Sequence, residues 1–492
     1  MAFQNGTSST CLEQPIELQD VSNYISKPQN AQIATSSNTG GLRLSDTKGA
    51  QESDPIENLP SPTTQSAAKL EQWNHPRSNF FKTSAAFWSF VVMGSNDAAY
   101  GALIPYLQEY YSLTFVVISL VFLSPLVGYT ASALLNNTIH LKFGQRGVAV
   151  IAPTCHLIAY VVIAVHPPYP VLVVIFMLAG FGNGLADAAW NAWMGNMANP
   201  NEVLGFLHAF YGVGAVLSPL IATTMITKGS RLPWYTFYYV MIAMAVIELA
   251  TSTAAFWHET GDKFRAANPR TSGTKDNRMK EALLRLPHAR VTWLCALFLL
   301  GYVGIEVALG GWIVKFMLEV RDGEDFASGM VATGFWMGIT VGRVVLGFVT
   351  PKIGEKLAIT VSSFFTPMLF LPHINPKHQI YLPITMALEL IFWLVPQFYV
   401  SAVAVSFQGF FLGPLFPAVV VAATKLLPRH LHVGAIGFAA AFGGSGAAIF
   451  PFAVGAIAQA HGVQVLQPII LALLGVILVL WLGLPRIHKK EE

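Results

Sequence analysis

Residues 171–197, VLVVIFMLAGFGNGLADAAWNAWMGNM, form a run that is long and apolar enough to cross a bilayer as one helix. The run nevertheless carries Asp187 near its middle. Asn183, Asp187 and Asn191 recur at every fourth position, so on a helix they form one polar stripe, which Trp190 flanks. A carboxylate at membrane depth costs roughly 3 kcal/mol or more, and such groups usually face a cavity and carry a function. The stripe therefore predicts a path for protons or for a polar solute.

Composition places the whole chain in a membrane. Of its 492 residues, 53% are hydrophobic and only 11% are charged, and the mean hydropathy is +0.52. Soluble domains carry about 25% charged residues, so we predict a polytopic all-α membrane protein in contact with the lipid bilayer. The net charge of +3 gives no ground for a nucleic-acid partner. The three cysteines are too scattered for a disulfide framework or a metal site.

Hydrophobic runs of about 20 residues indicate membrane helices. The first half of the chain has six of them, at roughly 84–107, 114–136, 147–166, 171–196, 203–226 and 234–257. A basic hydrophilic stretch covers 258–290, and seven runs follow, near 291–317, 327–349, 356–371, 380–396, 399–425, 433–459 and 465–485. The positive-inside rule favours twelve helices over thirteen. Twelve place the basic clusters around Lys142, Lys352, Lys425 and Lys489 in the cytoplasm together with both termini, whereas thirteen would place the last two clusters outside.

An internal repeat supports two six-helix halves. Residues 205–219, GFLHAFYGVGAVLSP, match 437–451, GFAAAFGGSGAAIFP, at eight of fifteen positions without a gap. Upstream, KFGQR at 142–146 matches KIGEK at 352–356. Parallel repeats of this kind pack around a central path in membrane transporters. A repeat combined with a buried titratable stripe favours alternating access over a channel.

The repeat also locates an irregularity in the second half. Gly144 and Gly180 are 36 residues apart, but their counterparts Gly354 and Gly409 are 55 apart, an excess of 19. Removal of residues 361–379 would join the flanking segments into one run of 22 residues, the length of a single ninth helix. We therefore interpret 361–379 as an insertion within helix 9, either a retained short intron or a re-entrant or loop insertion.

Three carboxyl groups are the candidates for proton coupling. Asp97 in the first helix and Asp187 in the fourth come first, because a carboxyl group in a low-dielectric cavity can be neutral in one state and ionised in another. Glu306 in the seventh helix is the third candidate. Arg343 in the eighth helix is either the counter-charge of Glu306 or a partner of the cytoplasmic loops. For each aspartate the alternative is a structural hydrogen bond between helices.

Other polar and aromatic side chains of the predicted helices are candidates for a solute site. They are Asn96, Asn183, Trp190, Asn191, His208, Tyr211, Trp312 and Gln408. Tryptophans can stack on a sugar or an aromatic ring, and the alternative for all of these side chains is ordinary helix packing. Glu248 and Glu389 lie in more uniformly apolar runs, for which we favour packing or interfacial roles. No Walker A, Gly-x-Ser-x-Gly, His-Glu-x-x-His or Cys-x-x-Cys pattern occurs, so an ATP-driven pump or an enzyme has little support.

Three motifs carry a resemblance to a known family. They are Asn96-Asp97, Gly182-Asn-Gly-Leu-Ala-Asp187 with Asn191, and Gly413-Pro-Leu-Phe-Pro417. With the two parallel halves, residues 82–486 resemble the major facilitator superfamily, and the motifs resemble its fucose:proton symporter branch, in particular the fungal bypass-of-stop-codon-like members. This resemblance implies that acids in helices 1 and 4, here Asp97 and Asp187, handle the proton and the sugar hydroxyls. The Gly-x-x-x-Asp-[Arg/Lys]-x-Gly loop signature of the superfamily lacks its Asp in both copies, and the helix 5 signature of drug:proton antiporters is not matched.

We therefore expect a major facilitator fold of twelve transmembrane helices that moves a small polar, monosaccharide-like solute by proton symport. We expect no cofactor, because the proton gradient drives transport. We also expect a monomer that resides in the plasma membrane rather than in the vacuole. The alternatives are a fungal efflux carrier for a secondary metabolite and a transporter-like sensor. The predicted organisation is a disordered cytoplasmic tail over 1–80, a six-helix half over 81–258, a basic cytoplasmic linker over 259–290, a second half over 291–485 and a cytoplasmic C-terminus over 486–492.

Overall fold

A computed structural model describes most of the hydrophobic part of the chain. It covers residues 71–198, 200–229, 231–267, 275–353, 381–428 and 431–485. Within these ranges the regular elements are helices, and the one β-type contact is an isolated bridge between Gln72 and His75. The predicted insertion at 361–379, the first 70 residues of the predicted tail and the predicted C-terminus at 486–492 lie outside the described residues.

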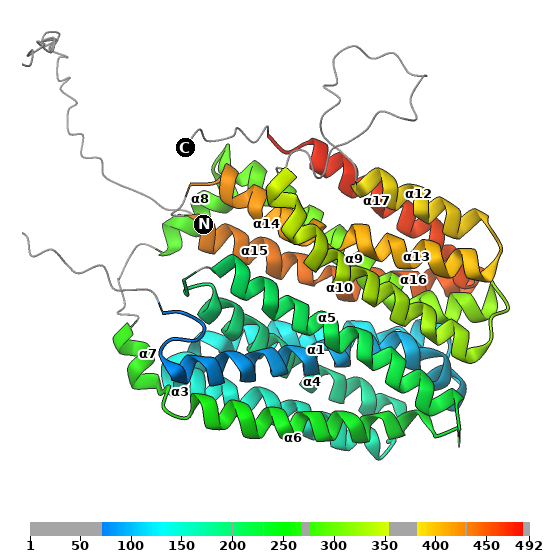
Figure 1. The fold of residues 1–492 in the computed structure, drawn as a ribbon, viewed down its shortest axis with the longest axis horizontal. Coiled ribbons are helices and arrows are strands. Elements are labelled where there is room, and N and C mark those ends of the chain that lie inside the picture. The colour runs from blue at the N-terminus through cyan, green and yellow to red at the C-terminus, as the bar shows by residue number, and fades with distance from the viewer. Residues whose placement is uncertain are drawn as a thin grey trace, which may run out of the picture. The chain divides into compact units, whose positions relative to one another are not determined.

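The first half of the chain supplies one bundle (Figure 1). Its elements are α1 Arg77–Tyr110, α2 Phe115–Ile118, α3 Leu120–Ala164, α4 Tyr169–Met194, α5 Pro200–Thr227, η1 Trp234–Thr236 and α6 Phe237–Phe256. Gly144 divides α3 into two arms, because its φ of 72° is not helical. A side chain at this position would meet the backbone of Glu259 and Thr260, so only glycine fits the bend. The bend falls in the KFGQR segment, where the sequence predicts the loop between helices 2 and 3.

The second half supplies the other bundle. Two short helices precede it, α7 Gly261–Ala267 and α8 Lys275–Leu284, within the predicted basic linker. The bundle itself contains α9 His288–Glu319, α10 Asp325–Ile353, α12 Tyr381–Leu394, α13 Phe398–Leu412, α14 Leu415–Leu426, α15 His432–Gly444, α16 Gly446–His461, η3 Val463–Val465 and α17 Leu466–Leu482. Breaks near Gly413 and Ser445 divide two predicted helices into the pairs α13–α14 and α15–α16.

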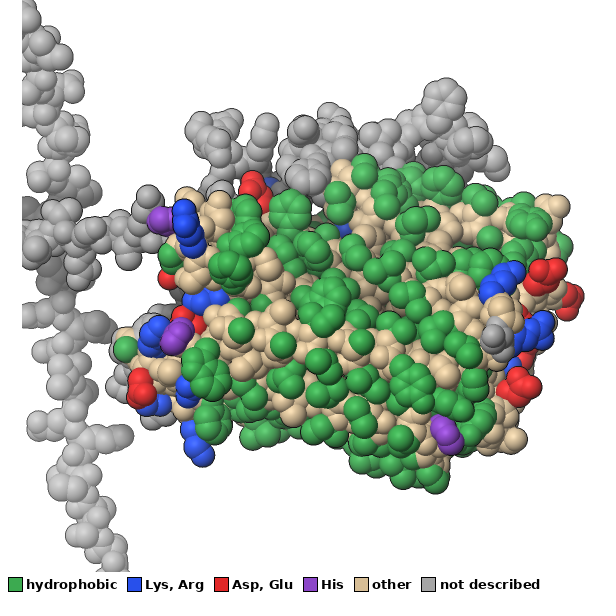
Figure 2. Space-filling view, turned by 60° about the horizontal axis from the view of Figure 1, so that its bottom comes forward, with side chains coloured by type: hydrophobic (Ala, Val, Ile, Leu, Met, Phe, Trp, Pro, Cys, Tyr) green, Lys and Arg blue, Asp and Glu red, His purple; other side chains and the backbone are tan. Residues whose placement is uncertain are grey.

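Nine stretches of the described residues are helical, long and apolar enough to cross a membrane. One of them, Phe115–Ala164, joins both arms of α3. Counting the two arms separately, and adding α1 and the shorter α12, gives the twelve positions that the sequence predicts. The outer surface agrees with a lipid environment, because hydrophobic side chains cover the broad face and charged side chains gather at its two ends (Figure 2).

The first helix begins earlier than the sequence pattern indicates. Its hydrophobic run starts near 84, but α1 starts at Arg77. The Asn79 amide donates to Glu71 Oε2 over 2.9 Å and to the Gln72 carbonyl over 3.1 Å, which ties the preceding turn to the helix. The last residues of the predicted tail are therefore part of the bundle. Polar residues at a membrane boundary carry no hydrophobic signal, so hydropathy alone misses this first turn.

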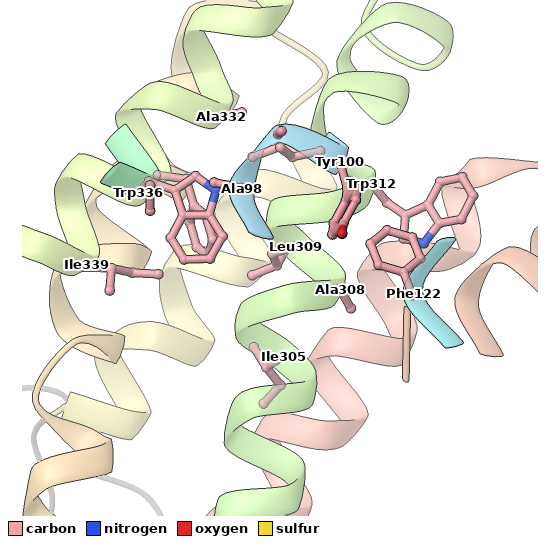
Figure 3. Packing of buried hydrophobic residues seen from close by; sticks show 14 of the residues in the cluster. Ala98, Tyr100, Phe122, Ile305, Ala308, Leu309, Trp312, Ala332, Trp336 and Ile339 are labelled. Carbon is pink, nitrogen blue, oxygen red and sulfur yellow. The ribbon is translucent and has the colours of Figure 1, made fainter. Parts of the chain in front are cut away.

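The two halves meet where α1 and α5 contact α9 and α10, and where α2 and α3 contact α16. Figure 3 shows Ala98 of α1 beside Trp336 of α10 and Tyr100 of α1 beside Trp312 of α9, within one buried cluster. The approach of α1 to α9 depends on glycine, because a Cβ on Gly101 would collide with the Gly310 carbonyl oxygen. Small residues of this kind let membrane helices pack backbone to backbone. This Gly101–Gly310 contact fixes how closely the halves approach in the described conformation.

Candidate functional site

Asp97 lies where three helices of the first half converge. Its Oδ1 accepts hydrogen bonds from the Asn96 amide on α1 and from the Asn183 amide on α4, each 3.0 Å long. Its Oδ2 accepts from the Tyr211 hydroxyl on α5 over 3.0 Å. The Asn96 amide also reaches the Tyr100 hydroxyl, 3.1 Å away. Both carboxylate oxygens are thus held by neutral donors, and the Asp97 side chain stays half-buried.

Glycines bring α5 close enough for Tyr211 to reach Asp97. A Cβ on Gly94 of α1 would collide with the carbonyl oxygen of Tyr211, and a Cβ on Gly214 of α5 would collide with that of Val91. The two helices therefore pack with their backbones in contact. Of the three repeated glycines in residues 205–219, Gly214 serves this packing, so one element of the repeat also positions the site.

The polar stripe of α4 divides between two partners. Asn183 turns to Asp97, whereas Asp187 Oδ1 accepts from the Asn191 amide of its own helix over 2.8 Å. Asp187 is half-buried and has no hydrogen bond to another helix among the described residues. The structure thus brings Asn96, Asn183 and Tyr211 to Asp97 and leaves Asp187 with a local partner.

The second half contributes a charged pair. One guanidinium nitrogen of Arg343 on α10 donates to both Glu306 oxygens, over 2.7 and 3.0 Å, and to the Tyr302 hydroxyl over 3.4 Å. Glu306 is 5% exposed and lies near the middle of α9. Arg343 is therefore the counter-charge of Glu306, which decides between the two roles predicted for it. A buried carboxylate beside a permanent cation stays ionised unless the pair opens.

Aromatic rings connect the Asp97 region with this charged pair. The ring of Phe416 on α14 lies 6.3 Å from that of His208 on α5 and 6.2 Å from that of Tyr302 on α9. His208 also meets the Phe90 ring edge to face at 5.7 Å. His208 is half-buried, and its contact with Phe416 places this predicted solute residue against the second half.

Three predicted solute residues are packing residues in the described conformation. Trp190 is 1% exposed and stacks on Phe256 at 4.4 Å. Trp312 is fully buried and donates to the Pro451 carbonyl over 2.9 Å. Gln408 is also fully buried and donates to Glu389 over 2.7 Å. Neighbouring helices cover these three side chains in this conformation, so the solute contacts predicted for them stay predictions.

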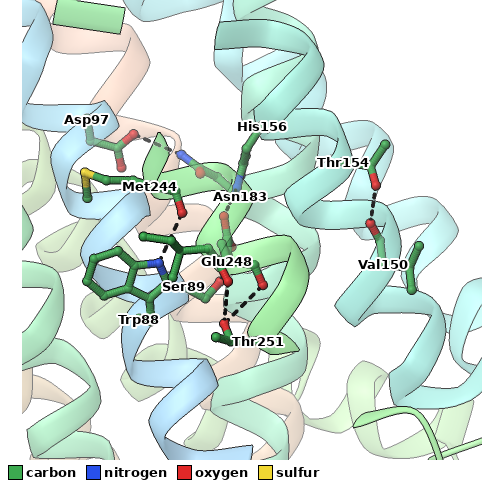
Figure 4. A network of polar contacts seen from close by, with 11 residues as sticks. Trp88, Ser89, Asp97, Val150, Thr154, His156, Asn183, Met244, Glu248 and Thr251 are labelled. Atoms are coloured by element: carbon green, nitrogen blue, oxygen red, sulfur yellow. Dashed lines mark hydrogen bonds and ion pairs between the residues drawn. The ribbon is translucent and has the colours of Figure 1, made fainter. Parts of the chain in front are cut away.

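The sequence did not predict that His156 and Glu248 form a buried polar pair in the first half. His156 in the second arm of α3 donates from Nδ1 to Glu248 Oε2 on α6 over 2.9 Å, and both side chains are fully buried. The Ser89 hydroxyl of α1 donates to Glu248 Oε1 over 2.6 Å (Figure 4). An interfacial role for Glu248 is therefore wrong. The sequence signal that could have revealed the pair is a histidine and a glutamate, each near the middle of an apolar run of the same half.

Comparison with known proteins agrees with this architecture. The family model "Major Facilitator Superfamily" matches residues 86–388. The chain belongs to the Major Facilitator Superfamily. The resemblance stated from the sequence is thereby confirmed, and with it a transporter rather than an enzyme. As a superfamily member, the protein has the all-helical fold of twelve spans in two halves.

Two curated relatives and several solved structures are similar to this superfamily member. Bypass of stop codon protein 6 of Saccharomyces cerevisiae is 30% identical over 429 residues, which is 82% of each chain. The glucose/mannose transporter GlcP of Bacillus subtilis is 21% identical over 265 residues, 54% of this chain and 65% of that protein. A D-xylose-proton symporter superposes with a TM-score of 0.64 at 14% identity, covering 82% of this chain and 98% of that one.

Two further solved structures share the fold. The inward-open xylose transporter XylE from E. coli gives a TM-score of 0.62 at 14% identity, over 84% of this chain and 97% of that one. The E. coli fucose:proton symporter gives 0.55 at 14% identity, over 83% and 98%. At this level of identity the likeness shows the fold, and the solute of the present superfamily member has to be argued from its own residues.

Proposed function

We propose that the protein is a secondary active transporter that moves a small polar, monosaccharide-like solute together with a proton, and that Asp97 carries the proton. The observation behind this proposal is the coordination of Asp97 by neutral donors from α1, α4 and α5. Unlike an acid held by arginine, a carboxyl group held by neutral donors can gain and lose a proton without leaving an uncompensated cation. Asp97 therefore suits a group that changes its charge during each cycle.

The same donors link the proton to the solute. While Asp97 is ionised, its oxygens accept hydrogen bonds from the Asn183 amide and the Tyr211 hydroxyl. A proton on Asp97 removes one acceptor site, so one of these donors becomes free for another acceptor. A sugar hydroxyl can accept from the freed donor and donate to a nearby carbonyl or carboxylate, since a hydroxyl does both. Proton binding and binding of a polyhydroxylated solute would then favour each other, which is what symport requires.

Other parts of the site fit a neutral polar solute. His208 and Tyr211 offer polar groups on a largely aromatic background, and Phe416 supplies an apolar ring from the second half. Aromatic faces with a few oriented polar groups are typical of sugar and small-molecule sites. The similar proteins include symporters of xylose and fucose and a glucose/mannose transporter, which supports the same substrate class. Asp187, with its single local partner, is proposed as an auxiliary acid.

The experiment is solute uptake by purified protein in liposomes. A panel of labelled pentoses, hexoses, polyols and apolar drugs is tested with an imposed proton gradient and after its collapse with a protonophore. We expect uphill accumulation of at least one pentose or hexose that requires the gradient, with alkalinisation of the medium on solute entry. Transport of a drug out against a proton influx would instead support the efflux alternative. Equal rates with and without the gradient would contradict proton coupling.

A further inference from the structure

His156 and Glu248 form a closed pair that the proposed transport site does not use. The pair is bounded by α1, α3 and α6, and the Glu248 carboxylate accepts from Ser89 and His156 on its two oxygens. Both side chains are fully buried. Ionised carboxylates typically accept hydrogen bonds on both oxygens, so this geometry fits an ionised Glu248.

Charge balance determines what His156 does in such a place. With a neutral imidazole the pair carries one buried negative charge, which is expensive in a low-dielectric surrounding. With one more proton, on Nε2, the imidazolium and the carboxylate together are neutral. The pair therefore has two states that differ by a single proton, and the protonated one carries no net charge. No metal-ligand cluster of histidine, cysteine and acidic residues occurs among the described residues to suggest another role.

Two atoms on the side of the pair that faces Asn183 lack a hydrogen-bond partner in the part of the chain that the structure describes. His156 Nε2 has no hydrogen-bond partner among the described residues, and the ring packs so tightly against α4 that a Cβ on Gly182 would lie 2.7 Å from Nε2. The next residue is Asn183, whose Oδ1 likewise accepts no hydrogen bond while its amide nitrogen donates to Asp97. Figure 4 shows Asn183 between Asp97 and His156. A protonated Nε2 is a donor without an acceptor, and Asn183 Oδ1 is an acceptor without a donor.

The neighbours of the pair leave Asp97 as its ionisable counterpart. The titratable side chains around it are Asp97 and Tyr100 on α1, Tyr160 on α3 and Tyr238 on α6, while α4 presents Gly182 and Asn183. Tyr160 stacks on the His156 ring at 6.0 Å. Tyrosine hydroxyls are neutral near pH 7. Of the side chains named here Asp97 is the carboxylic acid, so it is the counterpart with which the pair can exchange a proton.

We infer that His156 and Glu248 are a second proton-binding site, which exchanges a proton with Asp97 across Asn183 during transport. In this exchange the O–H bond of the Asp97 carboxyl breaks and an N–H bond forms at His156 Nε2. Asp97 becomes a carboxylate held by its three donors, and His156 becomes an imidazolium paired with Glu248. The charges balance without another reactant. The inference rests on the proposed proton-coupled transport and extends it to a residue pair away from the solute.

The test uses a double variant that combines His156→Gln and Glu248→Gln. It is compared with the single variant Glu389→Gln. The double variant leaves no unpaired charge, so it avoids the destabilisation that either single change would cause. Glu389→Gln is the matched control, because Glu389 is an equally buried acid that bonds to Gln408 in the other half. Each protein is purified, checked for its thermal unfolding midpoint and solute Kd, and reconstituted in liposomes with a solute that the wild type accumulates.

For the double variant we expect about tenfold lower proton-driven accumulation. We also expect the midpoint of its uptake-against-pH profile to shift by about one unit, since Asp97 no longer shares its proton with a second site. Solute Kd and solute exchange without a gradient stay near wild type, as does every property of Glu389→Gln. A merely structural role would lower the unfolding midpoint and the exchange rate and leave the pH midpoint unchanged, which would overturn the inference.

A wild-type pH profile and wild-type accumulation in the double variant would overturn it as well. The proposed function fails under a different result, namely that the wild type or Asp97→Asn shows the same uptake with and without a proton gradient. If Asp97→Asn loses gradient-driven uptake and the double variant retains it, Asp97 remains the proton carrier and the second site is rejected. The two claims are thereby tested separately.

Discussion

The acids of the two halves are held in opposite ways. In the first half Asp97 is surrounded by amides and a hydroxyl, and it is half-buried. In the second half Glu306 is held by the Arg343 guanidinium, and it is buried. A carboxyl group among neutral donors can change its charge, whereas one beside arginine is fixed as an ion. The comparison teaches that a repeated fold need not repeat its chemistry, and it supports the proposal that the proton is carried by the first half while the second holds a charge pair.

The largest expected effect is that of Asp97→Asn. An asparagine keeps the size of the side chain but cannot carry the proton, so accumulation driven by a proton gradient should disappear. Exchange of labelled for unlabelled solute across liposomes at equal pH should persist, because that process needs no net proton movement. Parallel uptake and counterflow assays measure the two. Accumulation that survives in Asp97→Asn would break the contrast between the halves.

A large loss of stability is expected from Arg343→Gln. The change leaves Glu306 buried without its counter-charge, which costs about 3–5 kcal/mol of unfolding free energy. Adding Glu306→Gln should recover most of this loss, because two neutral amides can bond to each other. Denaturant unfolding in detergent, followed by tryptophan fluorescence, compares the single and double variants. If the single variant is as stable as wild type, the ion pair does not hold the second half together.

Asp187→Asn should have a smaller effect than Asp97→Asn. Asp187 accepts one side-chain hydrogen bond, from Asn191 of the same helix. The loss of one charge-assisted bond corresponds to about 1.5 kcal/mol, or roughly tenfold in an equilibrium. We expect up to that factor in solute Kd or in the extent of accumulation, with proton dependence retained. Loss of all proton dependence would instead make the two aspartates equal partners, as their motifs alone suggest.

The smallest effect is expected from Trp312→Phe. Phenylalanine keeps an aromatic ring against Phe115 and Phe122 but loses the bond from the indole to the Pro451 carbonyl. The unfolding free energy should fall by about 1 kcal/mol. Solute Kd should stay unchanged, since the ring is fully buried. A weakened Kd with unchanged stability would show that Trp312 reaches the solute in another conformation.

Hydropathy and the internal repeat predict the number and order of the helices because both depend on local composition. They also identify Asp97, since an acid within an apolar run is conspicuous by itself. The partners of these groups were not predictable in the same way. The stripe of α4 suggested that Asn183 and Asp187 act together, yet Asn183 turns to a residue 86 positions earlier in the chain. Side-chain contacts between helices depend on rotation and packing, which periodicity along one helix does not contain.

The same limit explains the tryptophans and the histidine pair. Trp190 and Trp312 have the composition of a sugar platform, and only the packing of Phe256, Phe115 and Phe122 shows them covered. His156 and Glu248 are 92 residues apart, and each looks like an isolated polar residue in its own run. Burial and pairing are properties of the assembled bundle. The sequence therefore supplies candidates, and the arrangement of helices selects among them.

The contact between Gly101 and Gly310 has a mechanical consequence. Two backbones touch there with no side chain between them, so the contact is made by short-range dispersion forces. Such forces lose a quarter to a half of their strength once the atoms separate by about 0.5–1 Å. A very small separation of the two backbones therefore breaks the contact, and further separation meets little resistance from it. The halves would part abruptly at this point, so that the transporter spends its time in two distinct states with few intermediates between them.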